Sequence, residues 1–174
     1  MERRFTTIVA ADMVGYSRLV AADEVSAIDR FRLVRQEVIV PAIEDAGGRI
    51  IKTMGDGMLI EFASSHVALA AALDVQRKMH KREGHRPESE QLRFRIGINS
   101  GDAIIDGDDL LGDVVNIAAR LESLAPPGGI CLSDAARDLI PPEFAADFRE
   151  LGLQYVKNMP APVGVWNVKV EGVH

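Results

Sequence analysis

Apolar and polar residues repeat with two different periods along the chain, and the changes of period mark the expected elements. Mainly apolar segments at residues 5–11 and 130–133 predict buried strands, and alternation of apolar and polar residues over 92–99 predicts a strand with one buried face. Apolar residues at helical spacing predict helices over 64–83 and 112–123. Because these patterns alternate along the chain, they favour a sheet with helices packed on it.

A long helical pattern follows the first strand. Ser17 is expected to cap its start, Pro41 to break or kink it, and Gly47 to end it. Two apolar runs then follow, at residues 50–51 and 58–62, and a Gly-Asp-Gly sequence joins them. Short strand patterns joined by residues that tolerate positive φ are typical of a β-hairpin.

The second half of the chain predicts shorter elements. Ser100 and Gly101 are expected to turn the 92–99 strand back into a short strand at 103–105. A short helix is expected at 134–140, and strands at 148–153, 154–156 and 165–170. No linker divides the sequence, so residues 1–174 are expected to form a single domain around one mixed sheet.

Composition narrows the class of protein. The chain has 174 residues, of which 47% are hydrophobic and 26% charged, as in ordinary soluble globular proteins. Its net charge of −6 argues against a nucleic-acid partner, and no apolar stretch approaches the roughly 20 residues of a membrane span. The single cysteine excludes an intrachain disulfide and fits a reducing, cytoplasmic location.

Two aspartates stand at the ends of strand patterns. Asp12 ends the first apolar run, and Asp56 lies at the tip of the hairpin. An aspartate at a hairpin tip is ordinarily turn chemistry. Carboxylates at the ends of adjacent strands, however, also form sites for Mg²⁺, which brings phosphates with it. Gly15 and Tyr16 follow Asp12 at a strand-to-helix turn, where free backbone N–H groups suit phosphate oxygens.

A second polar set lies on the helix expected at 112–123. Asn116 and Arg120 are four residues apart and therefore share a face. One interpretation is a surface arginine that pairs with Glu122 or with solvent. The other is an amide and a guanidinium that converge on negative charge developing on a phosphate.

These motifs together resemble one known family. Residues 10–19, 47–62 and 109–122 match, in order, three motifs of class III adenylyl/guanylyl cyclase catalytic domains. The run A-A-D-x-V-G-Y-S-R-L is similar to that of a group of rhizobial-type bacterial adenylate cyclases. The resemblance extends from about Phe5 to Val170. It implies an α+β, ferredoxin-like cyclase fold, with one mixed, mainly antiparallel sheet and helices packed on it.

The resemblance also implies roles for individual residues. Asp12 and Asp56 match the residues that bind two metal ions, Mg²⁺ or Mn²⁺, and the carbonyl of Met13 would add a ligand. The remaining matches are Lys52 and Asp109 as the pair that reads the purine, Asn116 and Arg120 as the transition-state pair, and Lys157 as a contact to the terminal phosphates.

The expected function is therefore an adenylate cyclase that converts ATP to 3′,5′-cyclic AMP and pyrophosphate. A lysine donates to adenine N1 and a carboxylate accepts from the 6-amino group, whereas guanine reverses both features. Lys52 and Asp109 thus favour ATP, although a guanylate cyclase and a catalytically silent nucleotide-binding or dimerisation module remain alternatives. One departure is Asp102, which stands where some members carry an arginine that reaches phosphate.

The positions of Lys52 and Asp56 on one hairpin indicate how two copies of the chain would assemble. Lys52 and Asp56 are four residues apart, yet in the family they serve opposite ends of the nucleotide. The family places Asp12 and Asp56 on one protomer and the other matched residues on its partner. A head-to-tail homodimer with two composite sites is expected.

Overall fold

A mixed sheet forms the centre of the protein, in a computed structural model that describes residues 1–171. Its strands are β1 (Arg3–Val14), β2 (Arg49–Met54), β3 (Gly57–Phe62), β4 (Arg93–Asp106), β5 (Asp109–Leu111), β6 (Ile130–Ser133), β7 (Phe148–Gln154) and β8 (Val163–Val168). The order is β2-β3-β1-β4-β6-β8-β7, and β5 pairs with β4. Adjacent strands run antiparallel except β4 and β6, which are parallel. This arrangement confirms the predicted mixed, mainly antiparallel sheet.

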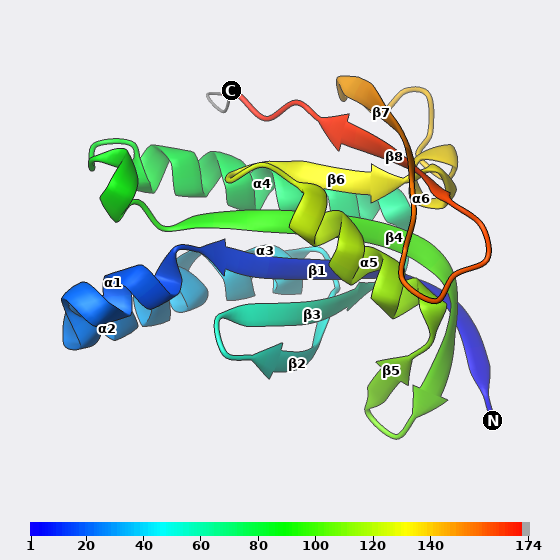
Figure 1. Ribbon diagram of the computed structural model, residues 1–174, viewed down its shortest axis with the longest axis horizontal. Coiled ribbons are helices and arrows are strands. Elements are labelled where there is room, and N and C mark those ends of the chain that lie inside the picture. The colour runs from blue at the N-terminus through cyan, green and yellow to red at the C-terminus, as the bar shows by residue number, and fades with distance from the viewer. Residues whose placement is uncertain (172–174) are drawn as a thin grey trace.

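Helices cover both faces of this sheet. They are α1 (Tyr16–Ala22), α2 (Glu24–Val34), α3 (Val40–Asp45), α4 (Ser65–Glu83), α5 (Asp113–Leu124) and α6 (Asp134–Asp138), with a π-helical turn η1 (Arg35–Ile39) and a 3-10 turn η2 (Glu88–Glu90). In Figure 1, α5 crosses one face of the sheet, and α3 and α4 lie behind the other. None of the helices within residues 1–171 is long and apolar enough to cross a membrane.

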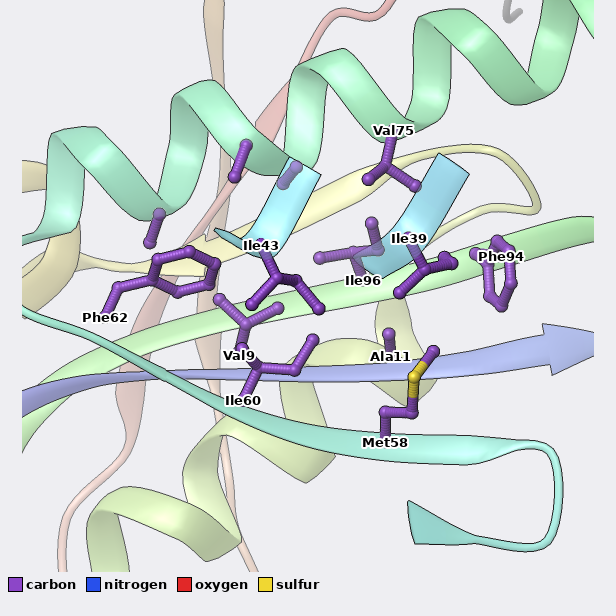
Figure 2. A pocket seen from close by; sticks show the side chains of 13 residues that line it. Val9, Ala11, Ile39, Ile43, Met58, Ile60, Phe62, Val75, Phe94 and Ile96 are labelled. Carbon is purple, nitrogen blue, oxygen red and sulfur yellow. The ribbon is translucent and has the colours of Figure 1, made fainter. Parts of the chain in front are cut away.

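Successive side chains of β1 point to opposite faces of the sheet and so contribute to two separate parts of the core. Val9 and Ala11 pack with α3 and α4 on one face, and Ile8 and Ala10 pack with α5 on the other. Figure 2 shows apolar side chains from the sheet, η1, α3 and α4 around a cavity of about 30 Å³ on the first face. All its lining residues are apolar, so a water molecule there would lack hydrogen-bond partners.

The predicted long helix is divided into shorter ones. Helix α1 begins at Tyr16, after Gly15 with φ 72°, so the prediction of Ser17 as the cap was wrong. A second break falls at Asp23, whose backbone is extended and whose side chain accepts a hydrogen bond from Ser26 N at 3.2 Å. An aspartate in this position is among the strongest N-caps, and it starts α2 as a new helix.

Pro41 changes the helix type without ending the helix. The N–H of Val40 bonds to Arg35 O, five residues back, in the π-helical turn η1, and α3 continues to Asp45. A proline ring in a regular α-helix clashes with the carbonyl four residues earlier. The wider turn relieves this clash, so the predicted interruption takes the form of a π-turn.

The predicted turn at Ser100 and Gly101 was wrong. Strand β4 continues to Asp106 because it pairs with β1 along the whole length of β1, from Val14↔Arg93 to Arg3↔Ile104. The chain reverses later, at Gly107 with φ 60°, and returns as β5. The strand expected at 154–156 is also absent, since β7 ends at Gln154. The longer β4 carries Asp109 to the side of the sheet where β2 lies.

Gly97 allows α5 to pack backbone-to-backbone on β4. A Cβ atom at this position would lie 2.3 Å from Glu122 N and 2.4 Å from Ala118 O. We expect Gly97→Ala to lower the free energy of unfolding by about 3 kcal/mol, because backbone cannot move aside as a flexible side chain can. Urea denaturation measures this loss.

The matched control for this substitution lies on the same strand. At Gly101 a Cβ would meet Val114 Cγ2 at 3.5 Å, an ordinary contact, so Gly101→Ala is expected to cost less than about 1 kcal/mol. Equal denaturation midpoints for the two variants would contradict the close packing at Gly97.

Candidate active site

Asp12 and Asp56 are brought together by the pairing of β1 with β3. Asp12 lies near the end of β1, and Asp56 lies in the two-residue turn between β2 and β3, after Gly55 with φ 63°. The pairing of Ala11 with Met58 sets this turn beside Asp12.

The two carboxyl groups repel each other. Burial raises the pKa of Asp12, and the negative charge of Asp56 and a hydrogen bond with it raise this pKa further. Met13 N, which donates to Asp12 Oδ1 at 3.0 Å, and the charge of Arg95 act in the opposite direction. A divalent cation between the carboxylates would remove the repulsion, so this pair fits a metal site.

The donor atoms also fit a hard cation. Carboxylate oxygens are the side-chain ligands that Mg²⁺ prefers, and one or two of them usually suffice when phosphates supply the rest. Within residues 1–171 no group of three or more His, Cys, Asp and Glu side chains is arranged to hold a metal. The remaining ligands would therefore be water, backbone carbonyl or substrate oxygens.

Lys52 and Asp109 form an ion pair next to this site. Lys52 Nζ on β2 lies 3.1 Å from Asp109 Oδ1 and 3.2 Å from Oδ2 at the start of β5. The hydrogen bond from Lys52 is the main cause of the lowered pKa of Asp109. About a third of each side chain is exposed (35% and 37%), so both groups remain accessible to a ligand.

Helix α5 presents opposite faces to the sheet and to solvent. Its buried residues are Val114, Ala118 and Leu121, and Asn116 is exposed. Asn116 borders a pocket of about 390 Å³ between α5 and the ends of β1, β2 and β3. The same pocket is lined by the polar side chains of Asp12, Lys52, Asp56 and Glu122. Four of the predicted site residues thus meet at one pocket of a single chain.

Arg120 and Lys157 lie outside this pocket. Arg120 follows Asn116 by one turn of α5 and is exposed. Lys157 is exposed in the turn after β7. Asp102, the departure from the family pattern, lines a different pocket, between α5 and α6. A single chain therefore does not bring Arg120 and Lys157 to the pocket that holds Asp12 and Asp56.

Gly15 and Tyr16 stand at the junction of β1 and α1. Gly15 adopts φ 72°, a conformation that favours glycine. The ring of Tyr16 packs against Phe31, with ring centroids 5.4 Å apart. Because the ring is engaged in this packing, a contact of Tyr16 with substrate would come from its backbone N–H.

Sequence reasoning missed the position of Glu122. This residue makes no ion pair with Arg120 in the described part of the chain and lines the pocket. Burial, followed by the negative charge of Asp12, raises the pKa of Glu122 to about 7; Arg95 lowers it and Asp56 raises it. The available signal was a stripe at i, i+4 and i+7, in which Glu122 follows Val115 and Ala119.

The mixed sheet, the paired carboxylates and the lysine–aspartate pair together define a nucleotidyl cyclase domain. Residues 4–167 match the model of the adenylate and guanylate cyclase catalytic domain. The chain belongs to this family.

Two curated relatives are longer than the chain. It is 39% identical over 166 residues to a candidate adenylate cyclase of Rhizobium meliloti, covering 95% of this chain and 28% of that protein. It is 30% identical over 131 residues to an adenylate cyclase of Streptomyces coelicolor, covering 75% of this chain and 33% of that protein. The chain thus spans about a third or less of these relatives.

Solved structures confirm the predicted fold. The crystal structure of an adenylate/guanylate cyclase/hydrolase from Silicibacter pomeroyi is 46% identical, with a TM-score of 0.91 over 99% of this chain and 100% of that one. The adenylyl cyclase CyaB of P. aeruginosa is 22% identical, with a TM-score of 0.82 over 97% and 96% of the two chains, and shows the fold alone.

Proposed function

We propose that the chain is a single adenylate cyclase catalytic domain that converts ATP to 3′,5′-cyclic AMP and pyrophosphate. The observation that carries this proposal is the Lys52–Asp109 ion pair, in a chain that also carries the paired carboxylates of Asp12 and Asp56. The Lys52–Asp109 pair suits adenine, and the two aspartates suit the cations that accompany a triphosphate. Family membership supports the cyclase chemistry, and the ion pair supports ATP as the substrate.

Asp12, Asp56 and the carbonyl of Met13 would hold the metal ions, Mg²⁺ or Mn²⁺. When bound, these ions supply positive charge to the triphosphate and lower the pKa of the ribose 3′-hydroxyl. The buried strand that carries Asp12 and the tight turn that carries Asp56 fix both carboxylates before substrate arrives. Little reorganisation is then needed during turnover.

Asn116 and Arg120 would act on the reacting groups directly. The amide of Asn116 positions the ribose, and the guanidinium of Arg120 donates to the oxygens of the α-phosphate as negative charge develops there. No protein nucleophile is needed, because the 3′-oxygen of the same nucleotide attacks the α-phosphorus and pyrophosphate leaves.

Lys52 and Asp109 would select the base. Lys52 Nζ donates to adenine N1, and Asp109 accepts from the 6-amino group. Guanine carries a donor at N1 and an acceptor at position 6, so both contacts would be mismatched. Unpaired polar groups in a site built for hydrogen bonding discriminate by several powers of ten in favourable cases.

A second copy of the chain would complete each site. Arg120 and Lys157 lie outside the pocket of their own chain, where they are available to a partner. Large apolar side chains are also exposed: Met54, two residues before Asp56, is 59% exposed, and Tyr155, two residues before Lys157, is 73% exposed. Their exposure supports a head-to-tail homodimer with two composite sites, because a partner chain would bury them.

Turnover of ATP and GTP, each with Mg²⁺ and with Mn²⁺, tests the proposed function. Cyclic nucleotide is quantified by chromatography. We expect cyclic AMP from ATP and a preference over GTP of at least about 100-fold. Cyclic GMP as the main product would overturn the assignment of Lys52 and Asp109. No product at concentrations where the dimer is present would favour a silent nucleotide-binding module.

A further inference from the structure

Glu122 has no role in the function proposed above, yet it shares the pocket of the paired aspartates. It lies on the face of α5 that also carries Val115 and Ala119, which line the same pocket. Solvated glutamates on helix surfaces usually point away from other acids, because like charges repel. Here the fold holds a third carboxylate in the pocket of Asp12 and Asp56.

The packing of α5 on β4 fixes this position. A Cβ at Gly97 would meet Glu122 N at 2.3 Å and the Glu122 Cα at 2.9 Å, so the helix backbone rests directly on the strand. Gly97 pairs with Ala10 of β1, and Arg95, two residues earlier, pairs with Asp12. The contact therefore places Glu122 beside the strand ends that carry Asp12 and Arg95.

The local charges leave the pocket negative. Three carboxylates, those of Asp12, Asp56 and Glu122, are offset by the guanidinium of Arg95, whose buried Nε has no hydrogen-bond partner among residues 1–171. The lysine of the purine pair is already neutralised by its own aspartate. When all three carboxylates are ionised, about two negative charges remain, which is the charge that one divalent cation neutralises.

We infer that Glu122 is a positioning residue that adds a third negative charge to the Asp12–Asp56 pair and raises its affinity for divalent cations. This inference rests on the proposed function, because it assumes that the two aspartates bind the metal. Glu122 acts on the metal through the field of its charge and through Asp12, as groups outside the direct ligands commonly do.

Binding of Mn²⁺ alone, followed by the electron paramagnetic resonance signal of the free ion, tests this role without turnover. At a pH above the Glu122 pKa of about 7, we expect Glu122→Gln to weaken Mn²⁺ binding about tenfold. Glu122→Asp keeps the charge on a shorter side chain and is expected to fall between wild type and Glu122→Gln. Glu143→Gln makes the same chemical change at an exposed loop position and should bind as wild type does.

Asp56→Asn separates the inference from the proposed function. If Asp56→Asn weakens Mn²⁺ binding and Glu122→Gln does not, the inference is overturned and the metal site stands. If neither substitution changes Mn²⁺ binding, the metal assignment of the proposed function is itself wrong. Thermal unfolding in the presence of a chelator shows whether each variant is folded. If Glu122→Gln does not fold, Glu122→Asp decides: weaker Mn²⁺ binding than wild type supports the inference, and unchanged binding overturns it.

Discussion

Asp56→Asn is expected to reduce cyclase turnover by at least about 1,000-fold while the fold and the dimer persist. The amide keeps the size of the side chain but removes the negative charge that would hold a metal ion, and metal catalysis is worth several kcal/mol. Asp56 lies in a hairpin turn and is partly exposed, so little packing is lost. Burial still raises the pKa of Asp12 in this variant, but the contribution from the negative charge of Asp56 is removed.

Steady-state turnover with saturating Mn²⁺ and ATP measures this effect. Size-exclusion chromatography and far-ultraviolet circular dichroism verify the dimer and the fold. Asp45→Asn is the matched control, because Asp45 is an exposed aspartate at the end of α3 and should leave turnover unchanged. Turnover of Asp56→Asn within tenfold of wild type would show that this carboxylate does not hold a catalytic metal.

Local patterns predicted most elements of the fold. The hairpin of β2 and β3 was predicted from two apolar runs around a Gly-Asp-Gly turn, and helix α4 from its helical spacing. Where prediction failed, a contact between distant residues decided the structure. Ser100 and Gly101 form a plausible turn in isolation, but pairing with Thr7 and Thr6 on β1 keeps them extended.

The sequence also predicted part of the candidate site. The resemblance paired Lys52 with Asp109 across 57 residues of sequence, and the structure brings them within 3.1 Å. Glu122 was missed because the direction in which it points depends on how α5 rests on β4 at Gly97. Sequence periodicity gives the face of a helix on which a residue lies, but it does not say which strand that face meets.

Two inactive variants are expected to restore activity when they are mixed. Asp56→Asn removes a metal ligand, and Arg120→Ala, at an exposed position, is expected to reduce turnover by about 100- to 1,000-fold through loss of charge stabilisation. In a head-to-tail homodimer these residues serve the same site from different chains. A mixed dimer then carries both defects in one site and neither defect in the other.

The size of the recovery distinguishes a composite site from one built within a single chain. With free exchange of an equal mixture, half of the dimers are mixed and about a quarter of all sites are intact, so about a quarter of wild-type turnover should return. Two different affinity tags and sequential purification isolate the mixed dimer and raise this figure to about a half. If each chain formed its own complete site, every site in the mixed dimer would carry one defect, and no turnover would return. The exposed position of Arg120, outside the pocket that holds Asp12 and Asp56, favours recovery, because within one chain that guanidinium does not border the carboxylates with which it must cooperate.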